Sequence, residues 1–221
     1  KYCYIMCRKL PPFFDHKYAI RYSRIETVSK IDEIAHPTAR EILRFLNIDY
    51  GVEISHEGDL PARSGMGSSS SFTVGLLHAL YALKGQMVSK QQLAKESIFV
   101  EQHLIKEIVG SQDQVSAAYG GFNQISFLQN GEILVSPIIL PHDRLIELNS
   151  HFMLFYSGIK RTASNIAKTY VESLDAKKRQ LRILQDLVKE AISILASNSP
   201  ISEFGHLLHE SWEMKRSLSS Q

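Results

Sequence analysis

The sequence predicts an α+β fold in which antiparallel strands come early and helices come late. Residues 1–8 and 19–28 are rich in Tyr, Ile and Val, which is typical of strands. Asn130 and Gly131 stand between two short apolar runs, and this pair is the strongest short-range indication of a β-hairpin. Long helical patterns occupy three late stretches: roughly 162–173, 176–197 and 202–218.

Composition limits what kind of protein this is. Its 221 residues are 44% hydrophobic, which excludes global disorder and allows a sizeable core. The 25 basic and 23 acidic side chains nearly balance, so no nucleic-acid partner is expected. No apolar run approaches the ~20 residues that span a bilayer, so no membrane partner is expected either. Nothing in the sequence indicates an oligomeric state.

The two cysteines, Cys3 and Cys7, lie four positions apart in the first predicted strand. That spacing puts them on one face, about 13 Å from each other. Because a disulfide needs Cα atoms within ~7 Å, we expect two buried free thiols. Free thiols are typical of a reducing compartment, so the expected location is the cytoplasm.

Local signals define the elements of the first half. Pro37 suits the first turn of a helix, and Ile42 and Leu46 recur behind it at helical spacing. A short strand is expected at 51–55. Ser89 and Gln92 form a capping box, which predicts a helix running to about residue 106.

Other signals place the remaining elements. A short helix at 112–119 is closed by Gly120 and Gly121, a C-cap signal. Trp212 lies at helical spacing from Phe204 and Leu208 in the last helix, so it is expected in the core. Three further strands are expected: 122–128 and 132–135 around the hairpin turn, and 151–156.

The most informative stretch is the loop from Pro61 to Ser71, which reads P-A-R-S-G-M-G-S-S-S-S. Gly65 and Gly67 can adopt left-handed angles and let the backbone approach a ligand closely. A helix follows, and a helix N-terminus presents unpaired N–H groups to an anion, usually a phosphate. The hydroxyls add donors, and one can bind Mg²⁺. The alternative is a Gly/Ser linker whose serine caps the helix.

Two acids further along could act with this loop. Glu101 is mid-helix, where an acid is ordinarily solvated, and Asp113 opens the helix at 112–119, where an acid often serves as a cap. The functional alternative is that Glu101 and a loop serine hold Mg²⁺ while Asp113 acts on an acceptor hydroxyl. Phosphoryl transfer needs these groups: metal ligands, phosphate donors and a residue that orients or deprotonates the acceptor. Spacing alone leaves both interpretations open.

Several segments together resemble the GHMP small-molecule kinases. The loop PARSGMGSSSSFTVG is similar to their second signature, Pro-x-x-x-Gly-Leu-Gly-Ser-Ser, with Met66 in place of the usual Leu. The resemblance is closer still to the D-glycero-D-manno-heptose phosphate kinases. It rests on five further segments: YSRIETV, DEIAHPTAREIL, GSQDQVSAAYGGFNQISF, LFYSGIKRTAS and LHESWEMKRSLS.

This resemblance implies transfer of the γ-phosphate of ATP to the anomeric hydroxyl of a heptose 7-phosphate. It places Mg²⁺ on Ser69 and Glu101, and makes Asp113 the candidate base. Lys160 and Arg161 are candidates for the phosphate of the sugar, the alternative being a surface Lys-Arg pair after a turn, and Gly120 and Gly121 are further candidates for substrate binding. The implied ATP-binding residues are those of the loop: Pro61, Ser64, Gly65, Met66, Gly67, Ser68, Ser69, Ser70 and Ser71.

The implied fold is a ribosomal-S5-like α+β domain at 1–150, followed by the start of a helix-rich, ferredoxin-like C-terminal domain at 151–221. The family's first motif, a Gly-rich segment ending in Thr-Asp, and its third, a Gly-rich loop, are absent from these residues. We therefore expect the chain to be incomplete at both ends and the 221 residues to be inactive by themselves.

Two other functions stay open. A kinase of the same superfamily could phosphorylate a free sugar such as fucose or galactose instead of a sugar phosphate. A binding or regulatory module could keep the fold without performing chemistry, although the presence of Ser69, Glu101 and Asp113 argues against that.

Overall fold

The computed structural model describes residues 2–59, 65–156, 158 and 178–217. These residues form two compact units, of which the first holds 2–121 and 158 and the second holds 122–156 and 178–217. The division at 121/122 precedes the expected domain boundary at 150, and the assignment of a domain to 1–150 stays a prediction. None of the described helices is long and apolar enough to cross a bilayer.

A four-stranded sheet with the order β1-β4-β2-β3 underlies the first unit. Strand β4 pairs antiparallel with β1 and parallel with β2, and β2 pairs antiparallel with β3. The elements of this unit are β1 (Cys3–Lys9), β2 (Tyr18–Arg21), β3 (Ile25–Val28), η1 (Ile31–Glu33), α1 (Pro37–Phe45), β4 (Val52–Gly58), α2 (Ser68–Leu83), α3 (Lys90–Phe99), η2 (Val100–Leu104) and α4 (Gln112–Tyr119).

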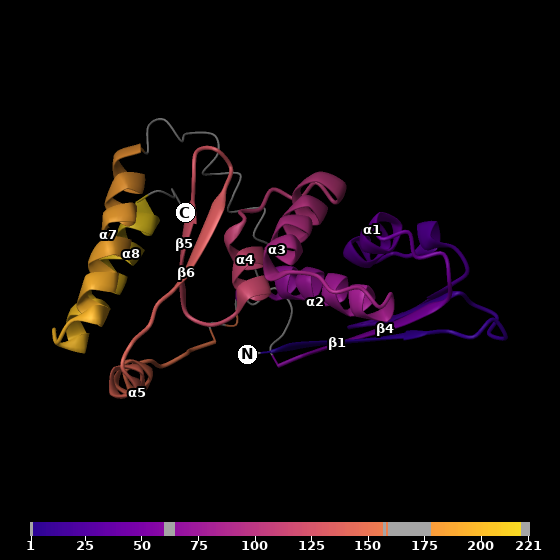
Figure 1. The fold of residues 1–221 in the computed structure, drawn as a ribbon, viewed down its shortest axis with the longest axis horizontal. Helices are drawn as coiled ribbons and strands as arrows, with labels where there is room; N and C mark the ends of the chain where they lie inside the picture. Colours follow the sequence, from indigo (N-terminus) through magenta and orange to yellow (C-terminus); the bar gives the residue numbers. More distant parts are fainter. Residues whose placement is uncertain (1, 60–64, 157, 159–177, 218–221) are drawn as a thin grey trace. The chain divides into compact units, whose positions relative to one another are not determined.

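Helix α2 packs closely on β1 and thereby fixes the position of its own N-terminus. A Cβ built on Gly75 of α2 would lie only 2.9 Å from Cγ1 of Ile5, so only glycine permits this approach. The buried side chains of α2, among them Leu76 and Leu80, join the main core of the unit. Figure 1 shows α1, α2 and α3 on one side of the sheet.

The helix expected behind Pro37 is confirmed as α1. His36 caps it, with the backbone N–H of Ala39 donating to His36 Nδ1 at 3.4 Å. The predicted cap of α3 is also confirmed, since the N–H of Gln92 donates to Ser89 Oγ at 3.1 Å. Helix α3 then continues into η2, a π-helical turn, before residue 106.

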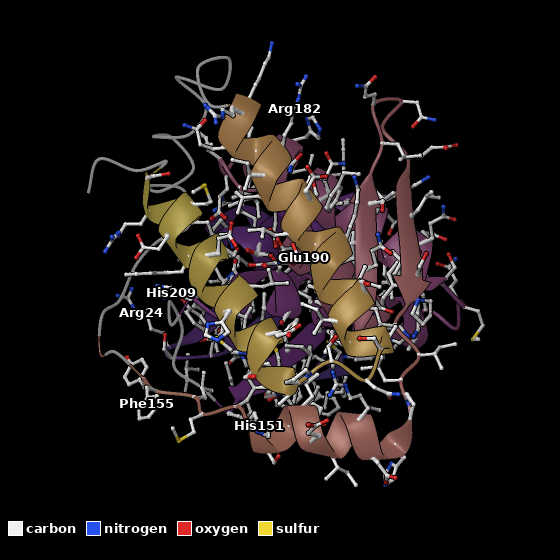
Figure 2. The ribbon with its side chains drawn as sticks, turned by 90° about the vertical axis from the view of Figure 1, so that its left-hand side faces the viewer. Arg24, His151, Phe155, Arg182, Glu190 and His209 are labelled. Carbon is white, nitrogen blue, oxygen red and sulfur yellow. The ribbon has the colours of Figure 1, made fainter. Side chains whose placement is uncertain are left out.

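The second unit consists of a hairpin and three described helices. Its elements are β5 (Asn123–Phe127), β6 (Ile133–Pro137), α5 (His142–Ser150), α7 (Lys178–Ala196) and α8 (Ile201–Ser217). Strands β5 and β6 pair antiparallel around Asn130 and Gly131, which confirms the hairpin. Figure 2 shows α7 and α8 side by side, with Arg182 and Glu190 on α7 and His209 on α8.

Two predicted strands are corrected. The single strand expected at 19–28 is two strands, β2 and β3, joined by a tight turn in which the N–H of Tyr22 donates to the carbonyl of Arg24 at 2.8 Å. The strand expected at 151–156 is not formed: these residues follow α5, which the sequence did not predict, and have no sheet partner among the described residues. Phe155 in this segment, which is labelled in Figure 2, has a side chain that is 79% exposed.

Two expectations about buried side chains are also corrected. Trp212 is half exposed rather than in the core, and its ring lies 4.6 Å from the guanidinium of Arg216. Cys3 and Cys7 form no disulfide, as expected, but both are half-buried rather than buried. Desolvation raises the pKa of the Cys7 thiol to about 12, which keeps it protonated and unreactive at neutral pH.

Candidate active site

The N-terminus of α2 has the backbone geometry that the loop sequence predicted. Gly67 is its N-cap at φ 67°, and Gly65 has φ 75°, so both use left-handed angles. The first helical hydrogen bond runs from Ser71 N to Gly67 O at 3.0 Å, and the Ser71 hydroxyl donates to the same carbonyl at 2.8 Å. The alternative interpretation of the loop is a Gly/Ser linker with a serine as the N-cap of the helix. The N-cap is Gly67, so that serine cap is not present. The first turn has the positive end of the helix dipole, which favours an anion.

Asp113 lies against this turn. A Cβ built on Gly67 would be 3.3 Å from both Cγ and Oδ2 of Asp113, so the carboxylate closely approaches the backbone of the loop. Asp113 is exposed in the first turn of α4, whose N-cap is Ser111. Ser111 makes no side-chain capping hydrogen bond, so the helix is not closed in the way a capping acid would close it, and the exposed Asp113 carboxylate can accept from a ligand.

Glu101 is buried against the N-terminal part of α2. It is 1% exposed, so it is not the solvated acid that its mid-helix position suggests. Oε2 accepts from the Ser70 hydroxyl at 3.0 Å and from Nε2 of Gln114, and Oε1 accepts from the Thr73 hydroxyl at 2.7 Å. Residues from α2, η2 and α4 therefore meet at one carboxylate. Figure 1 shows α2 and α4 packed together in this part of the first unit.

The Glu101 carboxylate has no cationic side chain beside it among the described residues, and this affects its pKa. Burial raises its pKa, and the hydrogen bonds from Thr73, Gln114 and Ser70 lower it in part. Within the described part of the chain, no Lys, Arg or His forms an ion pair with it. An ionised carboxylate in this position is stabilised only by neutral donors, which is the environment in which a bound cation is most favourable.

This environment fits a hard divalent cation. Mg²⁺ in proteins is commonly bound by one or two carboxylates together with substrate phosphates and water. Glu101 supplies a carboxylate beside the serine hydroxyls, and Gln114 Oε1 is a buried oxygen for which the described residues supply no donor. The described residues contain no cluster of three or more His, Cys, Asp or Glu side chains that could hold a metal, so one carboxylate with oxygen co-ligands is the fitting class.

Sequence reasoning missed two residues of this cluster, Thr73 and Gln114. Thr73 follows Ser70 by three positions and so shares its helical face. Gln114 directly follows Asp113, but only its 1% exposure distinguishes it from an ordinary surface amide. The signal for the burial of Glu101 was Ala94, seven positions earlier on the same face, which is itself buried.

The other expected site residues are placed as follows. Ser69 is exposed in the first turn of α2, and the hydroxyl that contacts Glu101 is that of its neighbour Ser70. Gly120 and Gly121 follow α4 with φ 61° and 77°, as the C-cap signal predicted. Four expected residues lie outside the described part of the chain: Pro61, Ser64, Lys160 and Arg161.

Comparisons with known proteins support the resemblance. The family model "GHMP kinases N terminal domain" matches residues 32–121. The chain is 26% identical over 163 residues to the D-glycero-alpha-D-manno-heptose 7-phosphate kinase of Campylobacter jejuni, covering 73% of this chain and 48% of that protein. It is 30% identical over 180 residues to the L-fucokinase/L-fucose-1-P guanylyltransferase of Bacteroides fragilis, covering 77% of this chain and 18% of that protein. The chain thus spans less than half the length of either relative.

A solved structure shares the fold. A crystal structure described as a D-glycero-D-manno-heptose 1-phosphate kinase from Bacteroides thetaiotaomicron superimposes with a TM-score of 0.72 at 22% identity. The superposition covers 97% of this chain and 67% of that one. The matched segment 32–121 contains the loop serines, Glu101 and Asp113, so the family match and the cluster coincide. Residues 32–121 are therefore a GHMP kinase N-terminal domain, and the chain has the GHMP kinase fold.

Proposed function

We propose that this protein is an ATP-dependent kinase that phosphorylates the anomeric hydroxyl of a sugar phosphate. The observation that carries the proposal is the approach of the Asp113 carboxylate to Gly67 at the N-terminus of α2. A phosphate-binding helix end and a carboxylate able to receive a hydroxyl proton are the two parts that phosphoryl transfer to an alcohol needs at one place.

The loop would bind the phosphates of ATP. Left-handed Gly65 and Gly67 keep side chains away from the approaching phosphate oxygens, while the serine hydroxyls and the N–H groups of the first turn of α2 donate to them. Positioning and charge stabilisation supply most of the catalysis in this chemistry, since little covalent work is left to the protein.

Asp113 would orient the acceptor hydroxyl and take its proton as the new O–P bond forms. The bond between the γ-phosphorus and the bridging oxygen of ATP breaks, and ADP leaves. The exposure of Asp113 gives the acceptor access to the carboxylate.

Glu101 and a loop serine would hold Mg²⁺ near the phosphates. When bound, the ion supplies neutralisation of the phosphate charge. The contribution of the chain is to keep Glu101 fixed by the buried donors Ser70, Thr73 and Gln114. Ser69 stays the proposed co-ligand because it is the exposed hydroxyl of this turn.

D-glycero-D-manno-heptose 7-phosphate is the acceptor we propose, because a heptose phosphate kinase appears both among the relatives and among the solved structures of this fold. Lys160 and Arg161 remain the proposed partners of its phosphate, since Arg binds phosphate through two parallel hydrogen bonds. The fucokinase relative supports the second candidate, a free-sugar 1-kinase.

An acceptor panel tests the proposal. ADP release by the protein at its natural length would be measured with heptose 7-phosphate, the unphosphorylated heptose, fucose and galactose. The proposal predicts the highest kcat/KM with heptose 7-phosphate. Higher kcat/KM with fucose or galactose would establish the second candidate, and no acceptor-dependent release would remove both.

A further inference from the structure

Gln114 connects the two carboxylates of the candidate site. Its Nε2 donates to Oε2 of Glu101, and its backbone follows directly on Asp113 in the first turn of α4. The orientation of the amide is determined by its partner, because an ionised carboxylate only accepts and the NH₂ group must therefore face it. Gln114 is 1% exposed, and its Nε2 is engaged by the hydrogen bond to Glu101.

The other end of this amide is not satisfied. Gln114 Oε1 is buried, and the described residues provide no hydrogen-bond donor to it. A buried acceptor without a donor destabilises the folded state, whereas an apolar side chain of similar shape avoids that penalty. Stability alone would not select a glutamine here. Side chains that lower the stability of the fold are expected at functional sites, where the correct placement of a catalytic group is worth the loss of stability.

We infer that Gln114 is a positioning residue that sets the location of Asp113 relative to Glu101. This inference rests on the proposed function, in which the two carboxylates have different tasks at one phosphate. The amide fixes Glu101 against Ser70 and Thr73, and the same residue anchors the first turn of α4, so Asp113 is held against Gly67. A shift of Asp113 by about 1 Å is enough to lower a rate by about 10²-fold.

Replacement by methionine separates this role from a structural one. Gln114→Met keeps the length and approximate volume but removes both the donor and the unsatisfied acceptor. We expect the midpoint of urea unfolding to stay the same or rise, while kcat falls by about 10–100-fold. KM for ATP and for the acceptor should stay within about twofold, because the inferred role of Gln114 is to position Asp113 and not to bind either substrate.

Ser97→Ala is the matched control. Ser97 is a fully buried polar residue of α3 whose hydroxyl donates to the carbonyl of Ala94 at 2.9 Å and not to Glu101. Its loss should lower the unfolding midpoint and leave kcat unchanged. A double variant with Glu101→Gln gives a second check, since Gln114→Met should cause no further loss of kcat once its partner carboxylate is gone.

The inference is overturned if Gln114→Met lowers the unfolding midpoint and kcat in parallel. It is also overturned if the fold-losses of kcat from Glu101→Gln and from Gln114→Met multiply in the double variant, as they would for two independent residues. Should the wild-type protein phosphorylate no acceptor, the proposed function fails, and hydrogen exchange decides the inference. Faster exchange of the α4 amides in Gln114→Met, at unchanged global stability, would still support positioning by Gln114. Unchanged exchange there would refute it.

Discussion

Gly67 and Asp113 lie so close together that a methyl group on Gly67 would push the Asp113 carboxylate away by a few tenths of an ångström. A Cβ on Gly67 would meet Cγ and Oδ2 of Asp113 at 3.3 Å, and Gly67 also has the left-handed φ of 67°. The N-cap of α2 therefore depends on glycine for two separate reasons, backbone conformation and the proximity of a carboxylate. The proximity of the Asp113 carboxylate is part of the proposed chemistry, and it can be tested separately from the backbone conformation of Gly67.

Gly67→Ala should reduce both stability and catalysis, whereas Gly85→Ala should reduce stability alone. Gly85 has a similar φ of 71° but open space where its Cβ would be. Both variants should lose about 1–2 kcal/mol of unfolding free energy from left-handed strain. Only Gly67→Ala displaces Asp113, so only its kcat should fall, by about tenfold or more. Equal kcat values in the two variants, measured alongside urea unfolding, would mean that the contact has no catalytic role.

Asp113→Asn should lower kcat by about 10²–10⁴-fold with little change in KM for ATP, because the amide cannot take the acceptor proton. Asp143→Asn is the control, as Asp143 is also an acid in the first turn of a helix, α5, outside the segment matched by the family. Steady-state kinetics of both variants provides the measurement. A kcat near that of the wild type in Asp113→Asn would remove Asp113 from the mechanism.

Ser69 and Ser70 should behave differently although they are neighbours. Ser70 is buried and donates to Glu101, so Ser70→Ala should cost about 1–3 kcal/mol of unfolding free energy. Ser69 is exposed, so Ser69→Ala should change stability by no more than about 0.5 kcal/mol. Ser69→Ala and Glu101→Gln should each raise the Mg²⁺ concentration needed for half-maximal activity.

The double variant decides whether Ser69 and Glu101 share an ion. If they do, the shift in Mg²⁺ requirement of Ser69→Ala plus Glu101→Gln should be smaller than the two separate shifts combined. Fully additive shifts, or a Mg²⁺ requirement that neither change affects, would exclude a shared metal.

Stability should decrease on acidification below about pH 6.5 because of His36 and His56. Burial lowers the pKa of both imidazoles below the ordinary 6.5, and each ring packs against Phe72. The unfolded chain therefore binds more protons, so the contribution is present above the unfolded pKa and is lost as the pH falls through the folded values. His36→Asn, which keeps a capping side chain, combined with His56→Phe should flatten the unfolding free energy between pH 7.5 and about 5.5. An unchanged slope in the double variant would assign it to other groups.

Sequence patterns predicted the elements whose signals are local. Pro37, the Ser89 cap and the turn at Asn130 and Gly131 all act within a few residues, and the structure has each of them. The segment 151–156 has strand-forming residues but no sheet partner among the described residues, and propensity carries no information about partners. Trp212 follows helical spacing, yet spacing does not say which face of a helix another element covers.

In the candidate site, too, the local features could be predicted from the sequence and the long-range contacts could not. The glycine and serine spacing was enough to predict the N-terminus of α2, since φ and helix ends are local properties. The sequence put Glu101 on the face of Ala94, but its burial also depends on the π-helical turn η2 and on α4 packing against α2, and these two features have no sequence signature. Gln114 was missed because its role depends on a contact with a residue 13 positions away.

The most direct test of the proposed function is a ³¹P NMR spectrum of D-glycero-D-manno-heptose 7-phosphate incubated with ATP, Mg²⁺ and the protein at its natural length. The account predicts that the γ-phosphate signal of ATP is replaced by ADP signals and by a second sugar-phosphate resonance coupled to the anomeric proton. Asp113→Asn should give this resonance at a rate lower by about 10²-fold or more. Hydrolysis of ATP without a new sugar-phosphate signal, or equal product formation by Asp113→Asn, would contradict the account.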